Sequence, residues 1–169
     1  MAKPPMVEVK VWGLALDEKN KVPVVILQEI QGKRRLPIWI GPNEASAIAM
    51  EMDGKKFQRP LTHDLMATML HGLKAIVSRV EISDLRENTF FARILVERGD
   101  EVLVIDARPS DSIALALRMH SQIFVEPRLL AEDFETALPE QAQSEDEKAE
   151  ELRRWIEELN PKDFGKFQM

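Results

Sequence analysis

Charged residues crowd a short turn in the stretch IDARPSDSIALALRM, between an apolar run that predicts a buried strand and a helical pattern. Asp106 ends the expected strand, Arg108 lies in the turn, and Ser110 and Asp111 fall in the first turn of the helix. The start of a helix attracts anions through its backbone N–H groups and macrodipole. Two carboxylates this close would repel a bare phosphate. A phosphodiester substrate would therefore need Mg²⁺ or Mn²⁺ between Asp106 and Asp111, with Arg108 and Ser110 contacting the phosphate.

A second polar cluster lies in RPLTHDLM, where Thr62 is the expected N-cap of another helix. His63 and Asp64 follow in the first turn, which we expect to be exposed, and Arg59 precedes the helix. A histidine titrates near neutral pH, so His63 is a candidate general acid or base, oriented by Asp64. Arg59 is a candidate phosphate contact.

Each of these residues also has a purely structural interpretation. Asp111 and Glu44 can simply stabilise the first turns of their helices. Asp106 can form a buried salt bridge with Arg108 or Arg118, and the histidine can be a solvated side chain beside a helix-stabilising aspartate.

Basic residues gather in two loops. One group is Lys33, Arg34 and Arg35, and the other is Lys55 and Lys56 with Arg59. Such groups can neutralise backbone phosphates without reading sequence. Hairpin tips are commonly charged in any soluble protein, so this signal for substrate binding is weak.

The sequence contains an internal repeat, and the polar turn at 106–111 has a counterpart at 39–44 in the first copy. A shift of 67 positions, which takes Pro42 to Pro109, lays LPIWIGPNEASAIAMEM on LVIDARPSDSIALALRM without a gap. Glu44 meets Asp111, which makes Glu44 a weaker candidate metal ligand, but Trp39 and Gly41 replace Asp106 and Arg108. The repeat predicts a duplicated ββα unit. Because the first copy does without these charges, the turn itself does not require them.

The remaining pattern predicts a mixture of strands and helices. Strands are expected at 7–11, 22–30, 35–40, 75–85, 89–97 and 102–107, and helices from Pro42, from Thr62 and over 109–119. The second helix is expected to bury Leu65, Met66, Met69, Leu70 and Leu73. Residues 1–138 form the expected α/β domain. Residues 139–169 are expected to form an acidic linker and an amphipathic helix, whose apolar face includes Leu152, Trp155, Ile156 and Leu159.

Composition narrows the class of protein. There are no cysteines, which excludes disulfides, thiolate metal sites and a cysteine nucleophile. The net charge of −6 comes from residues 132–169, so the main body is near neutral. Charged residues at positions 8 and 10 argue against a signal peptide, and no apolar run is long enough to span a bilayer. We expect a cytoplasmic protein without membrane contact.

Three motifs together resemble the bifunctional nuclease family of bacteria and plants. These are LPIWIGPNEASAIAMEM, RPLTHDLM and DARPSDSIALALR, in this order, and the resemblance covers residues 6–135. It implies nuclease activity on DNA and RNA, and a mixed, barrel-like curled sheet flanked by helices. It carries no settled catalytic assignment. The positions that match the motifs are Glu44, Arg59, Thr62, His63, Asp64, Asp106, Arg108, Ser110 and Asp111.

The leading hypothesis is a metal-assisted nuclease that cleaves DNA and RNA with little sequence preference. Asp106 and Asp111 would hold the cation, and His63 would transfer a proton. The alternative is a non-catalytic module that binds a nucleotide, a nucleic acid or a protein in the same crevice. The last helix is a candidate for homo-oligomerisation, or for masking the basic loops.

Overall fold

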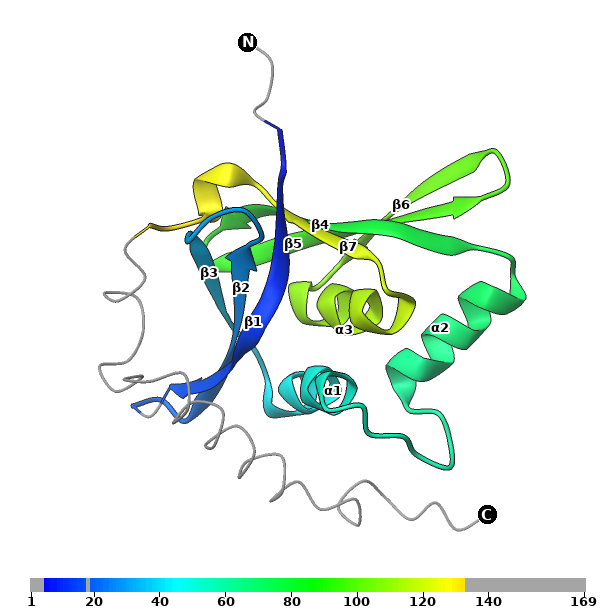
Figure 1. Ribbon diagram of the computed structural model, residues 1–169, viewed down its shortest axis with the longest axis horizontal. Helices are drawn as coiled ribbons and strands as arrows, with labels where there is room; N and C mark the ends of the chain where they lie inside the picture. Colours follow the sequence, from blue (N-terminus) through cyan, green and yellow to red (C-terminus); the bar gives the residue numbers. More distant parts are fainter. Residues whose placement is uncertain (1–4, 18, 133–169) are drawn as a thin grey trace.

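The computed structural model describes residues 5–17 and 19–132. Seven strands form one mixed sheet in the order β3-β2-β1-β7-β4-β5-β6. Neighbouring strands are antiparallel except β4 and β7, which run parallel. The strand bounds are β1 Val7–Asp17, β2 Val22–Glu29, β3 Arg35–Trp39, β4 Ile76–Arg86, β5 Thr89–Arg98, β6 Glu101–Ala107 and β7 Gln122–Val125. Figure 1 shows that this sheet curls around the helices without closing, so the expected mixed α+β fold with a curled sheet is confirmed.

The duplication predicted from the sequence is visible in the elements. Helix α1 (Pro42–Met52) and helix α3 (Pro109–Met119) begin and end at positions exactly 67 apart, and strands β2 and β5 begin at Val22 and Thr89. Strands β1 and β4 extend the repeat by one further strand. The two βββα units lie on either side of β7, which joins them at the centre of the sheet. The repeating unit is therefore larger than the ββα unit that the motifs indicated.

The core forms where the helices cover the inner face of the sheet. Helix α3 packs against β4, β5 and β7, while α1 and helix α2 (Thr62–Gly72) pack against α3. Alanines at positions 45, 49, 114 and 116 are buried between these elements and allow the helix backbones to approach closely. The large side chains Ile48 and Leu115, equivalent in the repeat, are almost completely buried. The start of each helix is thereby fixed relative to the others.

Two burial predictions are wrong. Residues 102–105 were expected to form a buried strand, but each of these side chains in β6 is between 44% and 59% exposed. In α2, Leu65, Met69 and Leu73 are exposed, and only Met66 and Leu70 of the expected stripe pack against the core. His63 and Ala67 are buried instead. The buried face of α2 is thus rotated by about one position. The predicted linker and C-terminal helix of residues 139–169 lie outside the described residues.

We predict that Leu115→Ala lowers the free energy of unfolding by about 2–5 kcal/mol, because it leaves a cavity in the core beneath the helices. Leu115 is 1% exposed. Leu65→Ala in α2 is the matched control, since Leu65 is 49% exposed, and it should change this value by less than about 1 kcal/mol. Urea unfolding measures both. Equal losses in the two variants would contradict the described packing.

Candidate functional site

The first turns of α1, α2 and α3 meet at one point. His63 Nε2 in α2 lies 3.0 Å from Asp111 Oδ1 in α3. Arg108, the N-cap residue of α3, places Nε 2.9 Å from Asp111 Oδ2 and Nη1 3.0 Å from Glu44 Oε1 in α1. Four side chains from three sequence-distant turns therefore form one continuous network, His63–Asp111–Arg108–Glu44.

The repeat explains how Glu44 and Asp111 come to share one arginine. Both helices begin with proline after an extended N-cap residue, Gly41 or Arg108. Glu44 and Asp111 occupy the same position in their first turns, and α1 packs beside α3. At Gly41 a Cβ atom would collide with the Glu44 carboxylate. A larger residue there would displace this carboxylate from Arg108.

His63 is only 9% exposed, so the expectation of an exposed first turn is wrong for this residue. A carboxylate only accepts hydrogen bonds, so the bond to Asp111 requires a proton on Nε2. In the neutral imidazole, Nδ1 is then the nitrogen that can take up a proton. The pair has the chemical form of an acid–base group held in one tautomer by a carboxylate.

The surroundings of Asp111 act on its pKa in opposing directions. Burial by itself raises its pKa, but the hydrogen bonds from Arg108 and His63 outweigh this effect and hold the pKa below 3.8. The pKa of Arg108 is raised, first by its hydrogen bond and charge attraction to Asp111. Asp111 is thus a carboxylate at neutral pH and able to stabilise an imidazolium at His63.

Asp64 does not orient His63, which corrects the sequence prediction. Its Oδ1 accepts a hydrogen bond from Arg118 Nε at 2.5 Å. Its Oδ2 accepts one from the backbone N–H of Leu61 at 2.9 Å, which makes Leu61, and not Thr62, the N-cap residue of α2. Burial raises the pKa of Asp64, but the bonds from Arg118 and Leu61 outweigh it and lower the pKa overall.

Arg118 is a buried connector that the sequence offered only as a partner for Asp106. Its side chain is 5% exposed, contacts Asp64, and lies 4.0 Å from Glu51. It also donates to the backbone carbonyls of Ala47 in α1 and Ala114 in α3. Arg118 therefore ties all three helices together. The sequence does contain a signal for this role. Arg118 follows Asp111 by seven residues, a spacing that places both on one face of α3.

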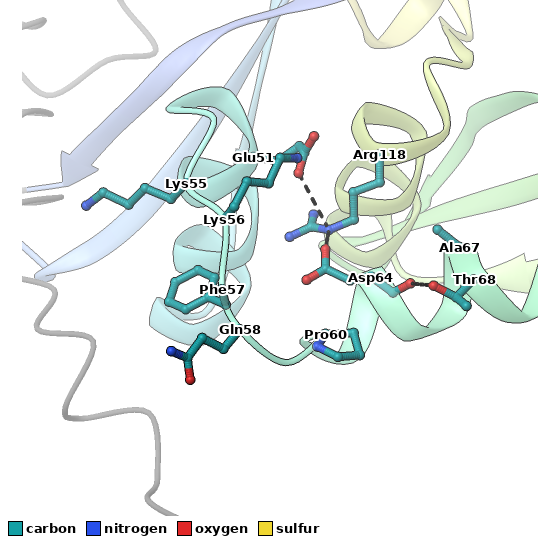
Figure 2. A pocket seen from close by; sticks show the side chains of 10 residues that line it. All are labelled: Glu51, Lys55, Lys56, Phe57, Gln58, Pro60, Asp64, Ala67, Thr68 and Arg118. Carbon is teal, nitrogen blue, oxygen red and sulfur yellow. Dashed lines mark hydrogen bonds and ion pairs between the residues drawn. The ribbon is translucent and has the colours of Figure 1, made fainter.

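An open hollow of about 480 Å³ lies beside this connector. Figure 2 shows the loop that follows α1 on the other side of the hollow from Asp64 and Arg118. The Lys56 side chain extends toward Glu51, while those of Lys55 and Gln58 point away from Arg118. Asp64, the residue after His63 in α2, lines this hollow. It is large enough for part of a nucleotide chain.

The other predicted residues are spread over the surface or serve local contacts. Arg59 is exposed on the loop before α2, Ser110 is buried at the start of α3, and Asp106 is exposed at the end of β6. Lys33, Arg34 and Arg35 lie around the β2–β3 turn, at the far end of β3 from the start of α1. Arg34 pairs with Glu29, and Arg35 stacks on Trp12.

Asp106 and Asp111 stay a prediction as metal ligands. Within residues 5–17 and 19–132, no three His, Asp or Glu side chains converge as a metal site. Asp106, Asp111 and Glu44 therefore do not form one ligand set, and the Arg108 guanidinium lies between the last two. Asp106 also lacks the expected salt bridge to Arg118 or Arg108. The acidic neighbours of Arg118 are Asp64 and Glu51, and those of Arg108 are Asp111 and Glu44.

Comparison with known proteins identifies the family. A model of the bifunctional nuclease domain matches residues 25–136, which include all three helices and the whole network. The chain belongs to the bifunctional nuclease family. Two Mycobacterium tuberculosis proteins, from strains CDC 1551 and H37Rv, are 38% identical over 165 residues. The match spans 94% of this chain and 98% of each relative, and both relatives are named as uncharacterized proteins. None of the described helices is long and apolar enough to cross a membrane.

We predict that Arg108→Gln raises the Asp111 pKa, because burial is then opposed by fewer hydrogen bonds. A carboxyl with a lowered folded pKa stabilises the fold above its unfolded value, near 3.8, and loses this contribution as the pH falls through the folded value. In Arg108→Gln the folded value moves toward the unfolded one or above it, so the variant should be less stable than the wild type above the unfolded value, and this difference should shrink as the pH falls below it. Carboxyl-carbon NMR titration and urea unfolding at several pH values test this. Arg98→Gln, which removes a pair with Glu101, should leave the Asp111 pKa unchanged.

We predict that Arg118→Met lowers the free energy of unfolding by about 2–3 kcal/mol. This is below the roughly 3–5 kcal/mol for a fully buried pair, because the Asp64 side chain is 33% exposed. Arg86→Met is the control, since Arg86 is an exposed partner of Asp84. Thermal or urea unfolding measures both variants, and a cost at Arg118 no larger than at Arg86 would contradict its role as connector.

Proposed function

We propose that this bifunctional nuclease family member hydrolyses phosphodiester bonds in DNA and RNA at the His63–Asp111 pair. The observation that carries the proposal is the 3.0 Å contact between these side chains, which brings an imidazole and a carboxylate together from turns 48 residues apart. Family membership supports a nucleic acid as the substrate. The contacts proposed below are to phosphate oxygens and not to bases, which favours low sequence preference.

The proposed chemistry follows from the tautomer. Hydrolysis requires a proton to leave the attacking water and a proton to reach the leaving oxygen. Neutral His63 would take the proton of the attacking water at Nδ1 while solvent protonates the leaving oxygen; protonated His63 would instead give its Nδ1 proton to the leaving oxygen while the attacking water loses its own proton to solvent. In both cases Nε2 keeps its bond to Asp111. The Asp111 carboxylate offsets the positive charge that His63 gains when it is protonated.

Arg108 supplies the proposed contact to the phosphate. Its Nε and Nη1 atoms bond to Asp111 and Glu44, and its side chain is 66% exposed. A guanidinium has five N–H donors, so Nη2 can donate to a non-bridging phosphate oxygen. When His63 is protonated, it and Arg108 together balance the charges of the Asp111 and Glu44 carboxylates. The network then carries no net negative charge that would repel a phosphate. The Lys56 side of the hollow would receive the adjacent nucleic-acid backbone.

A second candidate function, binding of nucleic acid without catalysis, also has support in the structure. His63 is nearly buried, and each carboxylate of the network already has a partner, which is also what a binding module without catalysis requires. In that case the chain would bind single-stranded nucleic acid or a nucleotide in the hollow, and His63 would only fix α2 against α3.

We predict that His63→Ala lowers the cleavage rate of fluorescent single-stranded DNA and RNA by about 10²- to 10⁴-fold, the usual contribution of a general acid or base. His71→Ala is the matched control, because His71 is exposed in the last turn of the same helix, and it should leave the rate unchanged. Binding without cleavage, or cleavage unaffected by His63→Ala, would contradict the proposal and, in the first case, favour the binding module.

Metal assistance remains a prediction from the sequence, and the same assay examines it. The described residues do not form a complete ligand set, so no step of the proposed mechanism depends on a cation. Cleavage is measured in EDTA, in Mg²⁺ and in Mn²⁺. Cleavage that persists in EDTA would show that the side chains of the chain suffice. Activity restored only by Mn²⁺ or Mg²⁺ would support the metal-assisted nuclease hypothesis.

A further inference from the structure

Strand β6 exposes an apolar surface that the proposed nuclease chemistry does not use. Val102, Leu103, Val104 and Ile105 are 59%, 45%, 58% and 44% exposed. These four residues are consecutive, so they point alternately to the two faces of the sheet. Both faces of β6 are therefore apolar and open. Burying such residues is favourable, and isolated exposed apolar residues are common, but a continuous run along one strand is not.

The repeat provides an internal comparison for this strand. Leu103 and Ile105 correspond to Leu36 and Ile38 in β3. Leu36 and Ile38 are 4% and 3% exposed and belong to the core. The equivalent positions in β6 have kept core-type side chains although nothing in the described part of the chain covers them. The side-chain chemistry of β6 is thus that of a buried strand.

The two edges of the sheet also differ in their backbone. At the β3 edge, Arg35 exchanges two backbone hydrogen bonds of 3.0 Å with Ala131, and Pro37 removes one donor. Strand β6 contains no proline, and its ladder with β5 runs without a bulge. Among the described residues no strand pairs with its outer edge. Edges of this kind pair readily with another strand, and proteins commonly block them.

We infer that β6 is a dimerisation edge, at which it pairs antiparallel with β6 of a second copy of this chain. A two-fold axis perpendicular to the sheet would pass midway between the two copies of Val104, the midpoint of β6 (Glu101–Ala107). Leu103 then opposes Ile105 of the copy, and Val104 opposes itself. The two sheets join into one, and the apolar side chains of both strands cover each other on both faces.

Charge and helix position select this register. With Val104 at the axis, Val102 opposes Asp106 of the copy, and Glu101 opposes Ala107, so no like charges meet. With Leu103 at the axis, Asp100 would oppose Asp106, which is unfavourable. With Ile105 at the axis, the strand would have to pair with Pro109, which lies in α3. The strand is therefore complementary to itself in one alignment.

The cysteine-free sequence allows a direct test of this alignment. Val104→Cys places the two thiols on opposing residues, whose Cα atoms lie about 4.5–5.5 Å apart in antiparallel pairs, within disulfide range. Under mild oxidation this full-length variant should form a disulfide-linked dimer. Val102→Cys is the matched control, because its two copies would be about 13 Å apart along the strands, and it should remain largely unlinked. Equal cross-linking of the two variants would overturn the proposed register.

The assembly state tests the edge independently of any disulfide. Light scattering of the full wild-type chain should give twice its mass of 19.3 kDa. Val104→Lys places two like charges at the axis and should give single chains, while Met69→Lys, at an equally exposed position of 58% in α2, should remain dimeric. Circular dichroism confirms that both variants fold. A single-chain mass for the wild type would overturn the proposal and make residues 133–169 the next occupant to test. A dimer that survives Val104→Lys would place the interface elsewhere.

Discussion

The buried Arg118 guanidinium is the interaction on which the arrangement of the helices depends. It donates to Asp64 at the start of α2 and to the backbone carbonyls of Ala47 in α1 and Ala114 in α3. Once Asp64 is fixed, the preceding residue, His63, has little freedom. His63 therefore contacts Asp111, in the first turn of α3. Two adjacent residues of α2 thus contact the first and last turns of α3, one for structure and one for the proposed chemistry.

The duplication explains why three helix N-termini can share one network. Equivalent helices α1 and α3 pack side by side and present acidic residues at the same position, where the N-terminal dipoles favour negative charge. Arg108 is the residue by which the second copy departs from the first, and its guanidinium bridges the two carboxylates. The two copies also differ at the sheet edges. Strand β3 pairs with Ala131 along its outer edge, whereas no described strand pairs with the outer edge of β6. Arg108 directly follows β6 (Glu101–Ala107), so the proposed dimer edge leads into the proposed site.

The sequence predicted the repeat, the helix α3 and the meeting of two polar turns, because these depend on local pattern and exact spacing. The role of Asp64 could not be settled from its neighbours alone. Adjacent helical residues do not face each other, which already argues against Asp64 orienting His63, but its partner Arg118 lies 54 residues away.

Burial was harder to predict than element type. The apolar run in β6 indicates a strand equally well whether the strand lies in the core or at an exposed edge. In α2, the buried face is set by the bond between His63 and Asp111 and not by hydrophobicity alone, so that Leu65 and Met69 point outward. Polar residues therefore decide the rotation of a helix whose apolar residues would permit another one.

The central claim is that His63 and Asp111 act as one unit, and a double-mutant cycle on oligonucleotide cleavage tests it most directly. The rates of His63→Ala, Asp111→Asn and the double variant are compared with that of the wild type. Residues that act together give strongly non-additive losses, so the double variant should be little slower than His63→Ala alone. Losses that multiply would show that the two side chains act independently and would contradict the account.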